Sequence, residues 1–221
     1  MARVLIIGAS GGIGSALATA CRARGDAVSG LSRSRDALDL TDEASVRRHL
    51  GACEGQFDLV LVASGALEIG GARPEKSLKA LRAEAMAAQF AVNAIGPALV
   101  LSHAPALLAR DRRAVLAVLS ARVGSIGDNR LGGWVSYRAA KAAVNQVVRC
   151  AAIELGRSHP ESICVALHPG TVETEFTRRY LGRHPAVRPA EAARNLLSVI
   201  DGLTPRQSGG FFDWAGEAVP W

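Results

Sequence analysis

The sequence has few cysteines, and none of them is closely paired with another. Cys21, Cys53, Cys150 and Cys164 show no CxxC spacing of the kind found in zinc sites and thiol redox sites. We identify no signal peptide, and no uncharged apolar run that approaches the roughly 20 residues needed to span a bilayer. These absences predict a cytoplasmic chain with reduced and mostly buried thiols, without a metal site and without a membrane partner.

A concentrated basic patch is also missing. The formal net charge is +6, but the basic residues are nearly all arginine and are scattered singly or in pairs, without interleaved aromatic side chains. This pattern is typical of a solvated surface and argues against a nucleic-acid partner. No linker, low-complexity segment or internal repeat divides the chain. We therefore expect one domain over residues 1–221, large enough to bury about 70% of its unfolded surface.

Apolar runs that favour β-strands alternate with alanine-rich stretches of helical length. Continuous apolar strands separated by helices indicate a doubly wound parallel sheet, here of about seven strands, with helices on both faces. Only seven residues separate Leu31 from Asp39, too few for a crossover helix, so this connection is expected to be short and irregular. The strand-like runs are Val4–Ile7, Ala27–Leu31, Leu59–Ala63, Ala114–Leu119, Ile163–Leu167 and a short one near Phe211.

Four glycines interrupt the chain directly after the first strand-like run. Gly8, Gly11, Gly12 and Gly14 stand where helix formers resume, and a glycine in a helix costs roughly 0.5 to 1 kcal/mol against alanine. In a doubly wound sheet this turn lies at the carboxyl edge, where the next helix points its positive end toward a ligand. Gly8 then permits the turn, Gly12 lets the backbone approach a pyrophosphate, and Gly14 lets the helix pack on the strand. A tight turn without a ligand is the alternative interpretation.

Tyr137 and Lys141 stand four residues apart in the alanine-rich stretch VSYRAAKAAVN, so they share one face of the expected helix. A solvated helix face is the ordinary interpretation of such a pair. Together with GASGGIG from Gly8, VNAIGP around Asn93 and HPGTVET from His168, however, the chain resembles the short-chain dehydrogenase/reductase family from end to end. The stretches LSARVGSIGDNRLGGW and SGGFFDWAGEAVPW resemble the branch that contains C-factor-like proteins and the sniffer carbonyl reductase.

This resemblance implies a Rossmann-type fold and a hydride transfer between a nicotinamide cofactor and a carbonyl or alcohol substrate. Tyr137 is the expected general acid/base, because the ammonium of Lys141 favours ionisation of a phenol whose free pKa is about 10. The family also implies that Lys141 orients the nicotinamide ribose. Asn93 is expected to hold a water that links Lys141 to solvent.

The hydroxyl that polarises the substrate carbonyl is less well defined. The family usually supplies it from the second serine of a Ser-Ser pair, and this chain has Ala121 at that position. Ser120 is therefore expected to take the role, with Ser125 as the alternative. Both serines also suit a purely structural role, in which they bond to loop backbone groups.

The residues after the second strand-like run decide the cofactor. An acidic side chain at this point favours the ribose of NAD, whereas cations favour the 2'-phosphate of NADP. Asp26 precedes the strand, at its far end, whereas Ser32, Arg33 and Arg35 follow it. Because a guanidinium group holds a phosphate in a bidentate fork, we expect NADP(H) as the preferred cofactor and NAD(H) as the alternative.

The resemblance also assigns the other cofactor contacts. Val62-Ala63-Ser64-Gly65 stands where relatives commonly have Asn-Asn-Ala-Gly, so Gly65 still lines the cofactor, but the sheet is expected to be braced by packing or by Ser64. His168 is given no catalytic role. The expected cofactor-binding residues are Gly8, Ser10, Gly12, Ile13, Gly14, Ser32, Arg33, Asp39 beside the adenine, Leu40, Gly65, Tyr137, Lys141, Pro169, Gly170, Val172 and Thr174.

The expected partner is a small carbonyl or alcohol compound. Its identity depends on the short loop Glu175–Pro185, with Trp134 and Phe176 as candidates for an aromatic wall. In the family, the alanine-rich helices around residues 85–109 and 137–156 pair with copies of themselves, so we expect a homodimer or homotetramer. The alternative to an enzyme is a nucleotide-binding regulatory or signalling protein with little turnover. The missing second serine favours that alternative, and the intact Tyr–Lys pair favours the enzyme.

Overall fold

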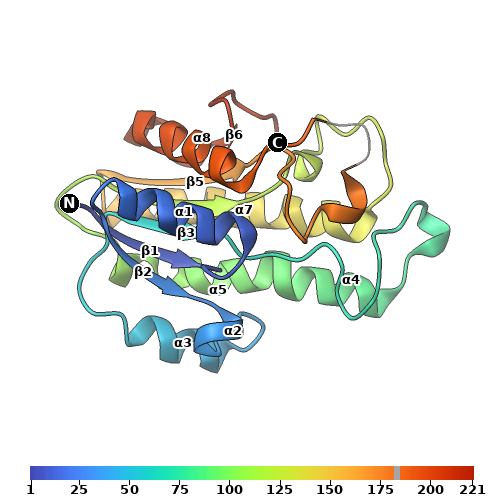
Figure 1. The fold of residues 1–221 in the computed structure, drawn as a ribbon, viewed down its shortest axis with the longest axis horizontal. Coiled ribbons are helices and arrows are strands. Elements are labelled where there is room, and N and C mark those ends of the chain that lie inside the picture. The colour runs from blue at the N-terminus through green and yellow to red at the C-terminus, as the bar shows by residue number, and fades with distance from the viewer. Residues whose placement is uncertain (182–184) are drawn as a thin grey trace.

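Six strands form one parallel sheet in the order β2-β1-β3-β4-β5-β6 (Figure 1). The computed structural model describes residues 1–181 and 185–221, so Arg183 of the expected substrate loop lies outside the described residues. The doubly wound architecture is confirmed, with six strands where about seven were expected. The strands are β1 (Arg3–Ile7), β2 (Ala27–Leu31), β3 (Leu59–Val62), β4 (Ala114–Leu119), β5 (Ser162–His168) and β6 (Phe211–Asp213).

Helices cover both faces of the sheet because the strands are apolar on both sides. Along β1, Leu5 and Ile7 belong to one buried cluster, whereas Val4 and Ile6 belong to the other. The first cluster packs under α3 (Glu43–Gly51), α5 (Gly96–Ser102) and α7 (Val135–Ser158). The second packs under α1 (Gly12–Ala23) and α8 (Pro189–Gly202), which lie side by side in Figure 1. This two-sided burial explains the continuous apolar strands.

The connection after β2 contains a single helical turn, α2 (Arg33–Asp36). The chain then passes through Asp39 directly into α3, as the short link in the sequence predicts. Because no crossover helix fits between β2 and Asp39, no further strand forms outside β2 within the described residues, and β2 is an edge strand. This short link accounts for the smaller sheet.

The expected long helix around residues 85–109 is interrupted. It begins as α4 (Ala83–Phe90), continues through a π-helical turn at Ala91–Ile95, and resumes as α5 and the short α6 (Ala104–Leu107). Residues 83–102 are long and apolar enough to cross a membrane by length and composition, with a mean hydropathy of 1.5. The expectation that no such run exists was therefore wrong. In the fold this stretch packs against α7 and the sheet, and core helices of globular proteins pass the same test.

The four thiols are all free, but only half of them are buried. Cys21 and Cys164 lie in the core, Cys53 is half-buried and Cys150 is exposed. The expectation of reduced thiols is consistent with this arrangement, whereas the expectation that most are buried was too broad. Cys150 lies on the outer face of α7, where helical periodicity places it away from the sheet.

Candidate active site

The order of the strands reverses between β1 and β3, and the space beyond their carboxyl ends is the expected ligand crevice. β1 pairs with β2 on one side and with β3 on the other, so the order of the chain reverses at this point. In an open parallel sheet, ligands bind beyond the carboxyl ends of the strands where the order reverses. Gly8 directly follows β1, and Gly65 follows β3 by three residues. Both sequence-predicted glycines therefore lie at this edge.

The glycine turn has the geometry that its sequence predicts. Gly8 has φ +89°, and a Cβ atom there would lie 2.9 Å from the backbone that follows β3. A Cβ atom at Gly14 would overlap the carbonyl oxygen of Gly8, so the turn excludes any side chain at both positions. Helix α1 begins at Gly12 without a side-chain cap on Gly11 and without an acidic residue in its first turn. Its first N–H groups are thus available to an anion, while Ile13 packs toward the core.

Gly12 faces the segment that follows β5. A Cβ atom at Gly12 would lie 2.6 Å from the Cγ2 methyl group of Thr174. Thr177 fixes this threonine, because its hydroxyl accepts a hydrogen bond from Thr174 N (3.1 Å) and donates one to the carbonyl of Val172. The structure therefore brings the glycine turn together with Val172 and Thr174, two residues that the resemblance assigned to the same cofactor.

The end of β2 carries a carboxylate that the sequence-based prediction did not include. Ser32 is buried and Arg33 is exposed, but Oδ2 of Asp36 accepts hydrogen bonds from Ser32 N (2.7 Å) and Ser32 Oγ (3.1 Å). A carboxylate one turn after a serine that precedes a helix, as in SRSRD, is the signal that would have revealed it. Ser34 Oγ donates to Ser10 Oγ (3.0 Å), which ties α2 to the glycine turn.

Asp39 and Leu40 lie between α2 and α3. Oδ1 of Asp39 accepts hydrogen bonds from Thr41 Oγ1 (2.7 Å) and Thr41 N (2.8 Å), and these bonds lower the pKa of the Asp39 carboxyl. Leu40 packs on the start of α5, where a Cβ atom at Gly96 would lie 2.9 Å from Leu40 Cβ. Asp39 is thus an ionised hydrogen-bond acceptor with a fixed orientation.

Helix α7 presents Tyr137 and Lys141 to the crevice from one face. Nζ of Lys141 lies 5.8 Å from the centre of the Tyr137 ring and donates a 2.9 Å hydrogen bond to the carbonyl of Leu119, the last residue of β4. A Cβ atom at Gly65 would lie 2.9 Å from Asn93 Oδ1 and 3.7 Å from Lys141 Nζ. The structure therefore gathers Tyr137, Lys141, Asn93 and Gly65 in one place.

Burial dominates the protonation of this pair. It raises the pKa of Tyr137 above the ordinary value for a phenol, and it lowers the pKa of Lys141 to about 8. Both shifts favour the neutral side chain. At neutral pH Tyr137 is a protonated donor and Lys141 is still mostly charged. The lowering of the tyrosine pKa that the resemblance implies is opposed here by burial.

Asn93 lies in the π turn and is fully buried. Its Oδ1 accepts from Ala66 N (3.1 Å), and its Nδ2 donates to Ala66 O (2.8 Å) and to Gln89 Oε1 (2.6 Å). Gln89 in turn donates to Leu67 O (2.8 Å). These two amides brace the segment after β3, whereas the Ser64 hydroxyl, which was expected as the alternative to packing, is buried without a hydrogen-bond partner among the described residues. The four-residue spacing of Gln89 and Asn93 could have indicated this role.

The two candidate serines differ in how their hydroxyl groups are used. Ser120 donates to Asn145 Oδ1 (2.6 Å), whereas Ser125 accepts a hydrogen bond from Asp128 N (3.0 Å). A serine has one proton to donate, so that of Ser120 is already engaged. Both residues are buried. Asn145, which the sequence-based prediction did not include, lies one helical turn beyond Lys141 on the same face.

Aromatic side chains surround the tyrosine. The ring centres of Trp134 and Phe176 each lie 6.3 Å from that of Tyr137. Trp134 also contacts Tyr180 edge to face at 5.3 Å, and the Tyr180 hydroxyl donates to Glu68 Oε1 (2.7 Å). Trp134 and Phe176 therefore lie where an aromatic wall was expected.

His168 ends β5 and precedes Pro169 and Gly170 at the crevice. Burial lowers the pKa of His168 to about 4, so its imidazole is neutral near pH 7 and does not serve as a general acid there. Gly170 has φ +78°, and a Cβ atom there would lie 3.0 Å from the Trp214 ring. Within residues 1–181 and 185–221, no group of three His, Cys, Asp or Glu side chains is arranged to hold a metal ion.

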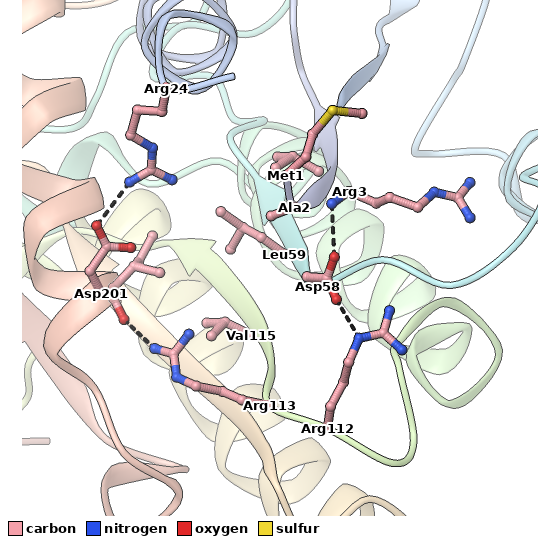
Figure 2. Close-up of a pocket in the computed structure, with 12 residues that line it drawn as sticks. Met1, Ala2, Arg3, Arg24, Asp58, Leu59, Arg112, Arg113, Val115 and Asp201 are labelled. Atoms are coloured by element: carbon pink, nitrogen blue, oxygen red, sulfur yellow. Dashed lines mark hydrogen bonds and ion pairs between the residues drawn. The ribbon is translucent and has the colours of Figure 1, made fainter. Parts of the chain in front are cut away.

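A separate pocket of about 550 Å³ lies at the opposite, amino-terminal edge of the sheet (Figure 2). Its charged groups bond to one another: Arg24 pairs with Asp201 (2.8 Å), and Asp58 accepts from Arg3 N and Arg112 Nε, each at 2.8 Å. None of the residues that line it belongs to the predicted site. Ion pairs and hydrogen bonds among the lining residues thus connect the amino-terminal ends of the strands.

At this edge the structure brings together an uncapped helix start, a glycine-rich turn and a buried Tyr–Lys pair, an arrangement that fits a nicotinamide dinucleotide. Residues 8–200 match a family model described as enoyl-(acyl carrier protein) reductase. The chain belongs to the short-chain dehydrogenase/reductase family, a family of oxidoreductases.

Curated relatives agree with this assignment. The chain is 41% identical to the C-signal protein of Myxococcus xanthus over 138 residues, which cover 62% of this chain and 78% of the relative. It is 30% identical to 1-hydroxy-2-glutathionyl-2-methyl-3-butene dehydrogenase of Rhodococcus sp. strain AD45, over 100% of both chains. The resemblance to the C-factor-like branch is confirmed.

Solved structures share the whole fold. The carbonyl reductase Sniffer of D. melanogaster aligns with a TM-score of 0.81 at 19% identity, over 100% of both chains. An NADPH-bound carbonyl reductase from chicken fatty liver aligns with a TM-score of 0.83 at 21% identity, over 100% of this chain and 94% of that one. A Burkholderia multivorans short-chain dehydrogenase/reductase with bound NADP aligns at 0.81 and 23% identity, over 100% and 99%. These similarities confirm the fold.

Proposed function

We propose that this protein is an NADPH-dependent oxidoreductase that interconverts a carbonyl compound and its alcohol. The observation that carries the proposal is the buried Tyr137 and Lys141 pair on one face of α7, beside Gly65 and Asn93 at the carboxyl edge of the sheet. A bound nicotinamide supplies the hydride. The chain supplies the proton, because Tyr137 is a neutral phenol at neutral pH and donates it to the substrate oxygen.

Two further residues, Lys141 and Asn93, support this proton donation. The Lys141 ammonium is anchored to Leu119 O and remains close enough to favour the developing phenolate. The side-chain amide of Asn93 is bonded to Ala66 and Gln89. We therefore assign the relay water toward Lys141 to the main-chain carbonyl of Asn93. A π turn at this position supports such a role, because it takes carbonyl groups out of the regular helical bonding pattern.

The carbonyl-polarising hydroxyl is Ser120 or Ser125. Ser120 lies at the end of β4 but must release Asn145 before it donates to a substrate. Ser125 uses its oxygen as an acceptor, which leaves its proton for donation. Either hydroxyl acts on the substrate oxygen that receives the proton of Tyr137.

NADPH oxidation, followed by absorbance with a panel of aldehydes, diketones and quinones, tests the proposal. We expect at least one compound to be reduced by the wild-type protein. Absence of turnover with every member, in protein that binds NADPH, would instead support the second candidate function, a nucleotide-binding regulatory or signalling protein. Ala121 in place of the second serine and the 41% identity to the C-signal protein favour that candidate.

The cofactor preference rests on the end of β2. Arg33 and Arg35 supply two positive charges there against the single carboxylate of Asp36, so the net charge still favours a 2'-phosphate. We expect Arg33→Ala to weaken NADPH binding by about 10- to 100-fold and to leave NADH binding unchanged, because a charge-assisted hydrogen bond contributes about 1.5–3 kcal/mol. Fluorescence titration with both nucleotides measures this. Arg47→Ala, an exposed arginine on α3, has the same change in net charge and is the control. Equal weakening of both nucleotides would contradict the assignment.

The rate of carbonyl reduction is expected to fall as the pH rises through about 8. The pKa of Lys141 is lowered to about 8, so its charged fraction decreases above this pH, while Tyr137 keeps its proton because its own pKa is raised. The measurement is kcat against pH with NADPH at saturation. Lys141→Arg keeps its charge over the whole range and should retain less activity but lose this alkaline decline. A flat wild-type profile to pH 10 (about the free phenol pKa) would be inconsistent with a charged Lys141 in catalysis.

We also propose that the protein forms a homodimer or homotetramer. Ile95 at the end of the π turn and Ile153 on α7 are half exposed, at 52% and 49%, on the helices expected to pair in a homodimer or homotetramer. Such apolar side chains suit a two-fold interface. A cytoplasmic location and a small-molecule substrate complete the proposal.

A further inference from the structure

Glu75 is a buried carboxylate on the connection between β3 and α4, only 7% exposed. Its Oε2 atom accepts a hydrogen bond from Ser136 N (3.3 Å), and its Oε1 atom accepts the hydroxyl of Ser136. Its main-chain carbonyl accepts a 2.5 Å hydrogen bond from Trp134 N. Glu75 therefore binds the chain on both sides of Val135, immediately before Tyr137.

These bonds act on the first turn of the helix that carries the proton donor. Ser136 is only 1% exposed, so its hydroxyl and N–H group depend on protein partners. Although burial alone raises the pKa of Glu75, the hydrogen bonds from Ser136 lower it below its ordinary value, and the carboxylate stays ionised. A negative charge at the start of the 24-residue helix α7 is also favoured by the helix dipole.

The backbone around Trp134 shows why such an anchor is needed. Trp134 has φ +51° and ψ +38°, a left-handed conformation that a bulky residue adopts only when its surroundings hold it there. Its side chain does not cap the helix, and the start of α7 is instead held by the bonds to Glu75. The indole ring contacts the Tyr137 ring edge to face, so the position of Trp134 bears directly on that of the tyrosine.

We propose that Glu75 is a positioning residue for Tyr137. It fixes the entry of the chain into α7 through Trp134 and Ser136, and thereby sets where the phenol points. The proposal rests on the proposed reductase function, because it concerns the orientation of that proton donor. It predicts that loss of Glu75 lowers kcat while the cofactor keeps its affinity, because the expected pyrophosphate and adenosine contacts follow β1 and β2 and lie at the start of α1.

The test compares Glu75→Gln and Ser136→Ala with wild type. We expect kcat per NADPH-binding site, counted by fluorescence titration, to fall about 10- to 100-fold in each variant, because small displacements of a catalytic group have effects of this size. We expect the NADPH dissociation constant to stay within about twofold, which is about one kT or less of binding free energy. The shape of the pH–rate profile should be unchanged. The double variant should lose little more than either single one, because the two side chains act through one contact.

Asp58→Asn is the matched control. Asp58 is also a loop carboxylate that accepts a main-chain N–H and a side-chain donor, but it lies at the opposite edge of the sheet (Figure 2). We expect it to lower the melting temperature without changing kcat per site. A Glu75→Gln protein with wild-type kcat per site, or one that has lost NADPH binding, would overturn the proposal.

Hydrogen exchange separates failure of this inference from failure of the proposed function. Glu75→Gln should accelerate exchange in residues 134–140 while residues 144–158 of α7 remain protected, and this readout needs no turnover. If wild type reduces no substrate but this local change appears, the reductase proposal fails and the contact stands. If exchange in residues 134–140 is unchanged, Glu75 does not position the tyrosine.

Discussion

Tyr137→Phe is expected to lower kcat for carbonyl reduction by about 10²- to 10⁴-fold, the usual contribution of a positioned general acid. The phenol is buried and its raised pKa keeps it protonated, so the side chain holds the transferable proton throughout the neutral range. Phenylalanine retains the ring that packs against Trp134 and Phe176. We therefore expect NADPH affinity and the melting temperature to stay close to wild-type values, and steady-state kinetics with a reducible carbonyl compound to show the loss.

Tyr180→Phe is the natural comparison, because Tyr180 is the other of the two tyrosines in the sequence. Its hydroxyl donates a hydrogen bond to Glu68. Its removal should change the KM of the carbonyl compound more than kcat. Equal kcat values for wild type and Tyr137→Phe would exclude this phenol as the proton donor and leave the regulatory function as the better proposal.

Gly14→Ala should disrupt the nucleotide site more severely than any exposed substitution. The added Cβ atom would overlap the carbonyl oxygen of Gly8 and lie 2.9 Å from its carbonyl carbon, and both atoms belong to a backbone turn that cannot rotate away. We expect a loss of about 1–3 kcal/mol in the free energy of unfolding, as for other overpacked positions, and a weakening of NADPH binding of at least about tenfold. Urea unfolding and fluorescence titration measure the two effects.

Gly156→Ala provides the contrast within a helix. A Cβ atom at Gly156 meets no heavy atom within 4 Å, and the position lies inside α7. Alanine there should increase stability by about 0.5–1 kcal/mol, because glycine is the poorer helix former. Comparable stability and NADPH affinity in the Gly14 and Gly156 variants would show that the turn adapts to a side chain.

Local sequence patterns predict much of the fold. Continuous apolar strands and intervening helices predicted the parallel sheet, and the seven residues after Leu31 predicted the short link at its edge. The π turn was not predictable, because residues 85–109 are apolar at most positions and carry too little periodicity to reveal a one-residue shift in helix phase. The prediction of buried thiols rested on composition alone. It missed the exposure of Cys150, because exposure depends on which face of α7 the residue occupies.

The candidate site likewise contains some residues that local sequence patterns predict and others that they do not. Tyr137 and Lys141 could be predicted to lie together, because residues four apart in a helix share one face. The partners of Glu75 and Asp36 could not be predicted, because they are fixed only when a loop folds back on a helix start. Gln89 is intermediate: its spacing from Asn93 was visible, but the carbonyl group that it binds lies on a connection with no regular pattern.

The short link after β2 has a consequence for association between molecules. With β1 on one side only, β2 presents free N–H and C=O groups along its outer margin within the described chain, the kind of margin on which sheets of separate molecules join. It is five residues long and includes Ser29 and Gly30, which give a neighbouring strand little to pack against. The short length and small residues of β2 therefore disfavour edge-to-edge association of sheets from separate molecules. A longer β2 that contains additional valine or isoleucine would lose this protection.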